Sequence, residues 1–136
     1  MVLTLDTSAL VAIERAIERE QSFDYPAEAH LVLPVIVWAE ALVGVRMADS
    51  PLRASRRRAR LEIIRQRSAF QFFSPEIAEH YADIFAELSA SGRKIPQNDL
   101  AVAATARFLK TGLLVGPDDE DHFRKVSGLE VIVLET

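Results

Sequence analysis

Short apolar runs alternate with longer segments of helical periodicity along the whole chain. The short runs predict strands at residues 2–5, 30–33, 69–73, 113–115 and 131–134. Apolar positions repeating every three or four residues predict helices between them, at residues 7–20, 35–47, 51–66, 75–89, 100–111 and 122–126. Residues 23–29, which include Pro26, predict a connection. This alternation indicates an α/β fold with a mostly parallel sheet of four to five strands, covered by helices on both faces.

A few residues sharpen the ends and faces of these helices. Ser74 and Pro75 predict the start of one helix, with the serine as its cap. The small residues of segment 100–111 allow close approach to the sheet, and Gly112 is predicted to cap the end of that helix. The inward face of the helix at 75–89 is predicted to carry Ile77, Tyr81, Ile84, Phe85 and Leu88.

Composition then narrows the class of protein. The chain has 136 residues, 49% hydrophobic and 26% charged, which fits a single globular domain over 1–136 rather than a disordered segment. No apolar run is long enough for a membrane span, and no basic region precedes an apolar one at the start, so neither a membrane anchor nor a signal peptide is expected. The absence of cysteine excludes disulfides and thiolate zinc sites and suits a cytoplasmic location.

Charge is spread unevenly although the formal net charge is only −4. Residues 51–67 hold seven arginines against one glutamate, so the rest of the chain is acidic. Arg53, Arg56, Arg57 and Arg60 fall on one side of the predicted helix. This basic face could contact RNA phosphates, face solvent while offsetting the acidic bulk, or contact an acidic partner.

Four acidic positions stand where a parallel sheet gathers its functional groups. Asp6 follows the first predicted strand, Glu40 interrupts an almost wholly apolar helix, Asp99 opens a helix, and the fourth is one of the group Asp118–Asp121 in an acidic turn after a strand. Each has a plain alternative: helix capping for Asp6, a buried Arg partner such as Arg107 for Glu40, the helix dipole for Asp99, and a solvated turn for any one of Asp118–Asp121. Together they offer oxygen ligands to Mg²⁺ or Mn²⁺, as in metal-assisted phosphodiester hydrolysis.

The motifs that contain these acids resemble a known family. Residues 5–10 (LDTSAL), the WAE sequence ending at Glu40, and residues 98–106 (NDLAVAATA) look like the PIN domain, and in particular the VapC toxins of bacterial toxin–antitoxin pairs. Order, spacing and length agree over essentially the whole chain. The resemblance implies a three-layer α/β/α fold and a Mg²⁺- or Mn²⁺-dependent ribonuclease. It also implies a homodimer held inactive by a VapB-type antitoxin.

The same resemblance assigns roles to individual residues. Asp6, Glu40 and Asp99 would be the three central acids that bind the metal. The fourth is taken to be Asp118, with Asp119 and Asp121 as alternatives. The residues expected to orient these acids, or a water at the metal, are Thr7, Ser8 and Asn98.

Two further features of the sequence bear on this reading. Gly116 stands where the family commonly has a threonine, so the hydroxyl expected at that position is absent. The three histidines share no ligand spacing and are predicted to be structural or solvent-facing, with His122 nearest the proposed centre.

Three functions therefore compete. The leading hypothesis is a VapC-type endoribonuclease in which a metal-activated water hydrolyses RNA. The second is a degenerate PIN domain that binds RNA or protein without cutting, suggested by the unusual turn at 116–121. The third is a phosphotransfer protein with Asp6 as nucleophile, which the sequence disfavours because no acid stands two residues after Asp6.

Overall fold

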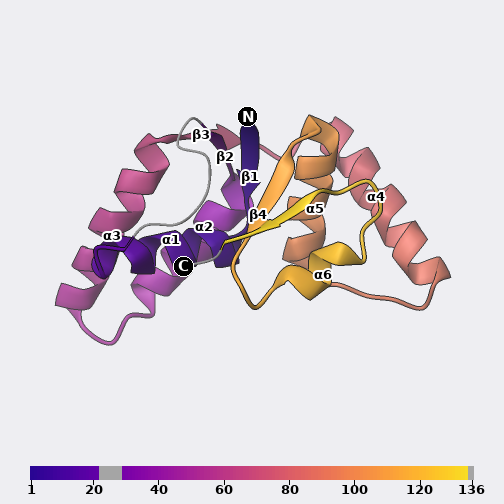
Figure 1. The fold of residues 1–136 in the computed structure, drawn as a ribbon. Helices are drawn as coiled ribbons and strands as arrows, with labels where there is room; N and C mark the ends of the chain where they lie inside the picture. Colours follow the sequence, from indigo (N-terminus) through magenta and orange to yellow (C-terminus); the bar gives the residue numbers. More distant parts are fainter. Residues whose placement is uncertain (22–28, 135–136) are drawn as a thin grey trace.

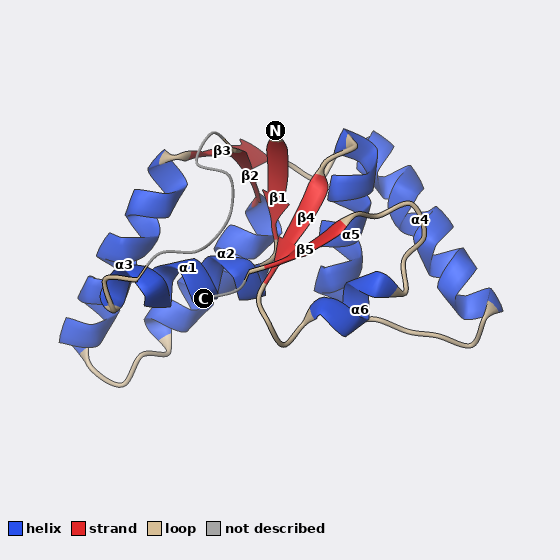
Figure 2. Ribbon diagram, in the orientation of Figure 1, coloured by secondary structure: helices blue, strands red, loops and turns tan. Residues whose placement is uncertain are grey.

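The computed structural model describes residues 1–21 and 29–134, and its centre is a parallel sheet. The five strands lie in the order β3-β2-β1-β4-β5, and every neighbouring pair is parallel. Figure 1 and Figure 2 show the helices on the two sides of this sheet, α1 to α3 on one and α4 to α6 on the other. The strands are β1 (Val2–Leu5), β2 (His30–Pro34), β3 (Ser68–Gln71), β4 (Gly112–Val115) and β5 (Val131–Val133). The helices are α1 (Thr7–Glu18), α2 (Val35–Arg46), α3 (Pro51–Gln66), α4 (Pro75–Ala90), α5 (Gln97–Leu109) and α6 (Glu120–Arg124).

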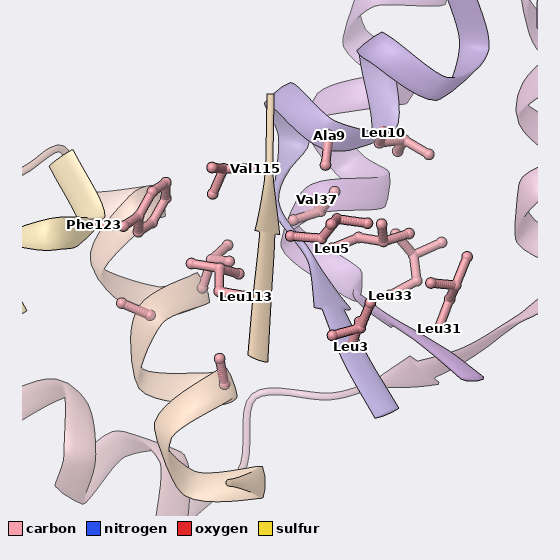
Figure 3. Close-up of a cluster of buried hydrophobic side chains, with 14 of the residues drawn as sticks. Leu3, Leu5, Ala9, Leu10, Leu31, Leu33, Val37, Leu113, Val115 and Phe123 are labelled. Atoms are coloured by element: carbon pink, nitrogen blue, oxygen red, sulfur yellow. The ribbon is translucent and has the colours of Figure 1, made fainter. Parts of the chain in front are cut away.

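The three-layer α/β/α architecture predicted from the sequence is confirmed. Each strand feeds a helix that returns along a face of the sheet, as parallel pairing requires. The core is aliphatic, with fully buried leucines on β1, β2 and β4 and Phe123 of α6 closing one end (Figure 3). None of the helices in the described ranges is long and apolar enough to cross a membrane.

Two local details of the predicted elements differ from the structure. The third strand covers Ser68–Gln71 instead of 69–73. Phe85 does not face inward, because its side chain is 57% exposed. The connection predicted at 23–29 lies outside the described residues except for Ala29.

The prediction that Gly112 caps the alanine-rich helix is wrong. Lys110 ends α5 in the left-handed conformation, with φ of 57°. Gly112 instead begins β4, where an added Cβ would lie 2.9 Å from Ile132 Cδ1 and 3.1 Å from Leu3 Cδ2. The glycine therefore serves close packing in the sheet rather than helix termination.

The order in which the chain adds strands to the sheet reverses between β1 and β4, which are neighbours in the sheet. The connection after β1 leads through α1 to β2 on one side, and the connection after β4 leads through α6 to β5 on the other. In open parallel sheets the crevice outside the carboxyl ends of two such strands is where ligands bind. Asp6 follows β1 and Gly116 follows β4, so both lie at this crevice.

Candidate active site

Asp6 is the most buried acid of the crevice, with 2% of its surface exposed. It is the N-cap of α1, and its Oδ2 accepts hydrogen bonds from the Ser8 amide at 3.2 Å and the Ser8 hydroxyl at 2.6 Å. The capping explanation offered by the sequence is thus confirmed, but it accounts for one oxygen only. The other oxygen, Oδ1, is buried and has no hydrogen-bond partner among the described residues.

Ser8 links Asp6 to the strand on the other side of the crevice. While its hydroxyl donates to Asp6, its oxygen accepts a hydrogen bond from the Gly116 amide at 2.9 Å. Ser8 therefore contacts Asp6, the acid that it was expected to orient, and it binds the residue after β4 at the same time.

Gly116 is required by this close approach. A Cβ at residue 116 would lie 2.9 Å from the Ser8 carbonyl oxygen and 3.1 Å from Ser8 Cβ. A threonine there would push the two segments apart. The backbone amide of Gly116 supports Asp6 through Ser8, so the site retains a donor at the position where the family hydroxyl is absent.

Glu40 lies in α2 and is held by α1. The Thr7 hydroxyl donates to Glu40 Oε1 at 2.7 Å, which joins two residues 33 positions apart. Arg107, the alternative partner considered from the sequence, instead pairs with Glu87 at 3.3 Å. Glu40 is half-buried at the crevice, and no arginine among the described residues forms an ion pair with it.

Asp99 occupies the first turn of α5 and meets a histidine. His122 Nδ1 lies 2.9 Å from Asp99 Oδ2, and because a carboxylate only accepts, this nitrogen carries the hydrogen. Sequence reasoning placed His122 near the centre but gave it no contact. Asn98, expected to orient Asp99, is exposed and is not among the described residues that line the crevice.

The crevice is a cavity of about 570 Å³ that brings the predicted acids together. Its acidic lining combines Asp6, Glu40 and Asp99 with two residues of the turn, Asp118 and Asp119. Asp121 is exposed on α6 and does not contribute to this lining. The structure thus leaves two of the three turn candidates at the cavity.

The negative charges of these carboxyl groups repel one another, and this repulsion contributes to the raised pKa values of Asp6 and Asp99. Burial raises the pKa of Asp6 to about 6, the Ser8 hydroxyl opposes the rise, and the charge of Asp99 adds to it. Burial also raises the pKa of Asp99; the His122 contact lowers it, while the charges of Asp119 and Glu40 raise it further. Repulsion in such a cluster is relieved either by protonation or by a cation that compensates its charge.

The residues present fit a hard divalent cation. The donor set is made of carboxylate oxygens, which Mg²⁺ and Mn²⁺ prefer, and Asp6 Oδ1 is a buried acceptor without a donor. Within the described part of the chain, however, no group of three or more acidic or histidine side chains is arranged so that it could hold a metal ion. The acids thus line the cavity without forming a preassembled ligand set, and an ion bound there would keep several waters.

The basic helix predicted at 51–66 is mostly engaged within the protein. Arg60 of α3 pairs with the buried Glu14 of α1 at 2.6 Å, and Arg57 donates to the Gly44 carbonyl at 3.0 Å. Other ion pairs of α3 are Arg53–Asp49, Arg58–Glu62 and Arg65–Glu62. These contacts support the reading in which the arginines offset the acidic bulk of the chain.

Comparison with known proteins agrees with this geometry. A family model described as PIN domain matches residues 3–129. Ribonuclease VapC2 of Haemophilus influenzae is 30% identical to the chain over 127 residues, covering 92% of each protein. Ribonuclease VapC1 of Rickettsia felis is 26% identical over 136 residues, covering 100% of this chain and 98% of the relative.

Solved structures share the fold over nearly the full length. The VapBC2 structure of Rickettsia felis, bound to a promoter DNA fragment, superposes with a TM-score of 0.81 at 21% identity, covering 99% of this chain and 100% of that one. VapBC-5 of Mycobacterium tuberculosis gives a TM-score of 0.78 at 24% identity, covering 97% and 98%. The family match over residues 3–129, the curated relative at 30% identity and the acidic crevice together show that the chain belongs to the PIN domain family.

Proposed function

We propose that this chain is a divalent-metal-dependent endoribonuclease, the toxin component of a VapBC-type toxin–antitoxin pair. The observation that carries the proposal is Asp6, a buried carboxylate with one oxygen fixed by Ser8 and the other without a donor, in a cavity lined by further acids. The curated relatives are named as ribonucleases, which supports RNA as the substrate. Mg²⁺ or Mn²⁺ is the cofactor that this oxygen donor set favours.

Asp6, Glu40 and Asp99 are the proposed metal ligands common to the cavity and to the family motifs. The fourth comes from the turn, where Asp118 and Asp119 both line the cavity. Asp119 is half-buried whereas Asp118 is exposed, and the charge of Asp119 raises the pKa of Asp99. This favours Asp119 over Asp118, the residue chosen from the sequence, as the fourth ligand.

Within this proposal the neighbouring residues hold the ligands in place. The Gly116 amide and the Ser8 hydroxyl fix Asp6, the Thr7 hydroxyl fixes Glu40, and His122 fixes Asp99. A bound divalent ion would supply an activated water and neutralise charge on the phosphate. Hydrolysis adds water across the P–O3′ bond and leaves a 5′-phosphate and a 3′-hydroxyl.

Conservative substitutions of the acids test the proposal. Asp6→Asn and Asp99→Asn are each expected to reduce metal-dependent RNA cleavage at least about 100-fold, since each removes a charged ligand. Asp83→Asn on the exposed face of α4 is the matched control and should cleave normally. Full cleavage by both site variants would overturn the assignment.

The degenerate-domain alternative makes an opposite prediction about metal. Titration calorimetry with Mn²⁺ should detect binding to the parent protein and a marked loss for Asp119→Asn. Asp118→Asn should show a smaller loss and Asp121→Asn none, because only the first two residues line the cavity. Absence of Mn²⁺ binding to the parent protein would favour a non-cleaving domain.

The proposed partners follow from the relatives. The neighbouring structures are described as VapBC complexes, which supports a VapB-type antitoxin as partner, and the family expectation of a homodimer is retained in the proposal. Co-expression with a cognate VapB-type antitoxin should restore the growth of cells that express this chain and yield a complex on size-exclusion chromatography. Growth arrest that such a partner does not relieve would argue against the toxin–antitoxin assignment.

A further inference from the structure

The acidic cavity has a basic side that the metal site does not use. Arg15 of α1 and Arg19, the residue that caps the end of this helix, line the same cavity as Asp6, Glu40 and Asp99. Both arginines are exposed, so their guanidinium groups can meet a ligand without losing a buried contact. The last turn of a helix favours a cation in any case, but that effect does not require two arginines on the wall of this cavity.

Helix geometry places the two arginines along one wall. Arg15 and Arg19 are four residues apart and therefore share a face of α1 with Thr7 and Ser8. Asp6 caps the start of this helix, so Arg15 stands about 13 Å and Arg19 about 20 Å from it along the axis. Apart from the two arginines, the residues of this wall beyond Ser8 are small or apolar, namely Val11, Ala12 and Ala16. The wall thus runs from an acidic end to a basic end.

These arginines differ from those of α3. Most α3 arginines pair with acids or carbonyls of the protein, as Arg60 does with Glu14. In residues 1–21 and 29–134 neither Arg15 nor Arg19 forms an ion pair. A polyanion approaching the acidic centre would be repelled there, so a cationic surface beside it is what allows RNA to dock.

A second, smaller hollow of about 170 Å³ continues the path. It shares Thr7, Val11, Arg15 and Glu40 with the main cavity and extends to Arg57. Arg15 therefore stands where the two hollows meet. A nucleic-acid strand whose scissile phosphate lies at the acids could therefore pass this residue on its way from one hollow to the other.

We propose that Arg15 and Arg19 bind the RNA backbone a few nucleotides away from the scissile phosphate and position the strand for cleavage. This inference rests on the proposed ribonuclease function. The two residues contact phosphates only, so they contribute affinity without sequence preference.

Fluorescence anisotropy with a labelled single-stranded RNA of about 15 nucleotides tests the proposal, in EDTA so that no metal-dependent cleavage occurs. The variant Arg15→Gln/Arg19→Gln is expected to bind roughly ten-fold more weakly than the parent. The dependence of log K on log salt should become shallower by about 1.4, since each phosphate contact to a single strand contributes about 0.7. With Mg²⁺ or Mn²⁺ present, the KM for RNA cleavage should rise while kcat is retained.

Arg56→Gln/Arg67→Gln is the matched control, because it removes the same charge at exposed positions outside both hollows. The control should keep the parent's salt dependence. An equal loss in both variants, or no loss in the Arg15/Arg19 variant, overturns the proposal. Loss of antitoxin binding alone, with RNA binding intact, overturns it in favour of a protein contact.

The experiment separates this inference from the ribonuclease assignment. If the parent cuts RNA and the Arg15/Arg19 variant has the same KM and salt dependence, the arginine inference fails and the nuclease stands. If the parent cuts no RNA but its RNA binding depends on the two arginines, the nuclease assignment fails and the binding surface stands.

Discussion

Asp6 is subject to two opposing influences within one side chain. The Ser8 contacts favour the carboxylate form, whereas burial and the neighbouring Asp99 disfavour it, and burial dominates. An acid that only capped α1 could lie closer to solvent, where its charge would not have to be desolvated. Its burial makes sense when the charge is used by a ligand.

Asp6→Asn is expected to make the metal-free protein more stable at pH 7.5, by up to about 3 kcal/mol. The folded-state pKa of about 6 lies above the unfolded value, so the folded state of the parent holds the extra proton. The parent's stability therefore falls as pH rises through the interval from about 4 to 6 and levels off above it. Urea unfolding between pH 4 and 8 should show this slope in the parent and a flatter profile in the variant.

Gly116→Ala is expected to destabilise the protein by about 1–3 kcal/mol, because the new methyl group collides with the Ser8 backbone. Gly44→Ala is the matched control. Its Cβ would meet only Arg57 Nη1 at 3.8 Å, and alanine suits the interior of α2, so a gain of about 0.5–1 kcal/mol is expected. Thermal unfolding distinguishes the two, and equal effects would contradict the role given to Gly116.

At the residue scale the sequence located the acids but not their supports. Asp6, Glu40 and Asp99 were predictable because strand ends and helix starts converge at one edge of a parallel sheet. The Gly116–Ser8 bond joins residues 108 positions apart, and the His122–Asp99 contact depends on how α6 docks against α5. No local pattern encodes either contact. The close approach at residue 116 is visible only once β1 and β4 are side by side.

At the scale of elements, a partly buried arginine of α3 forms ion pairs that join this helix to α1. Glu14 is almost fully buried, and Arg60 reaches it at 2.6 Å while also approaching Glu18. This contact positions the helix whose start holds Asp6. The orientation of α1 is therefore fixed at both ends, by Ser8 near the sheet and by Glu14 near α3.

Arg60→Ala is expected to cost about 3–5 kcal/mol, because it leaves the Glu14 carboxylate buried without a partner. Arg53→Ala removes an exposed pair with Asp49 on the same helix and should cost less than about 1 kcal/mol. Chemical denaturation of the two variants measures the contrast. A small effect of Arg60→Ala would indicate that water reaches Glu14.

Most elements were predictable from hydrophobic periodicity, and the exceptions have physical causes. Lys110 ends α5 in a left-handed conformation that glycine usually adopts, whereas the nearby Gly112 lies in β4, where close packing leaves no room for a side chain. Phe85 has the spacing of an inward residue but lies at the edge of the α4–α5 contact, where it remains exposed. Hydrophobic periodicity predicts a helix and its inward face, but it does not predict which residues at the edge of that face remain exposed.

At the scale of the whole molecule, divalent cations are expected to raise the Tm of the parent protein. An ion that binds only the folded state stabilises it by RT ln(1 + [ion]/Kd), about 2.7 kcal/mol when the ion is at about 100 times Kd. The effect should fade as pH falls below 6, because protons compete for Asp6. Asp6→Asn should lose the Mn²⁺ response at all pH values, while Asp83→Asn keeps it. A Tm that does not respond to Mn²⁺ at pH 7.5 would contradict the metal site.

The position of β4 between β1 and β5 also governs when activity can arise during synthesis. Asp6 leaves the ribosome early, but Gly116 and the acidic turn leave only after most of the chain has been made. Until β4 pairs with β1, Ser8 has no bond to Gly116 and the cavity lacks one wall. A nascent chain, or one truncated before residue 112, therefore carries three of the acids without a cutting centre. Translation itself therefore delays the nuclease until β4 has been made and has paired with β1.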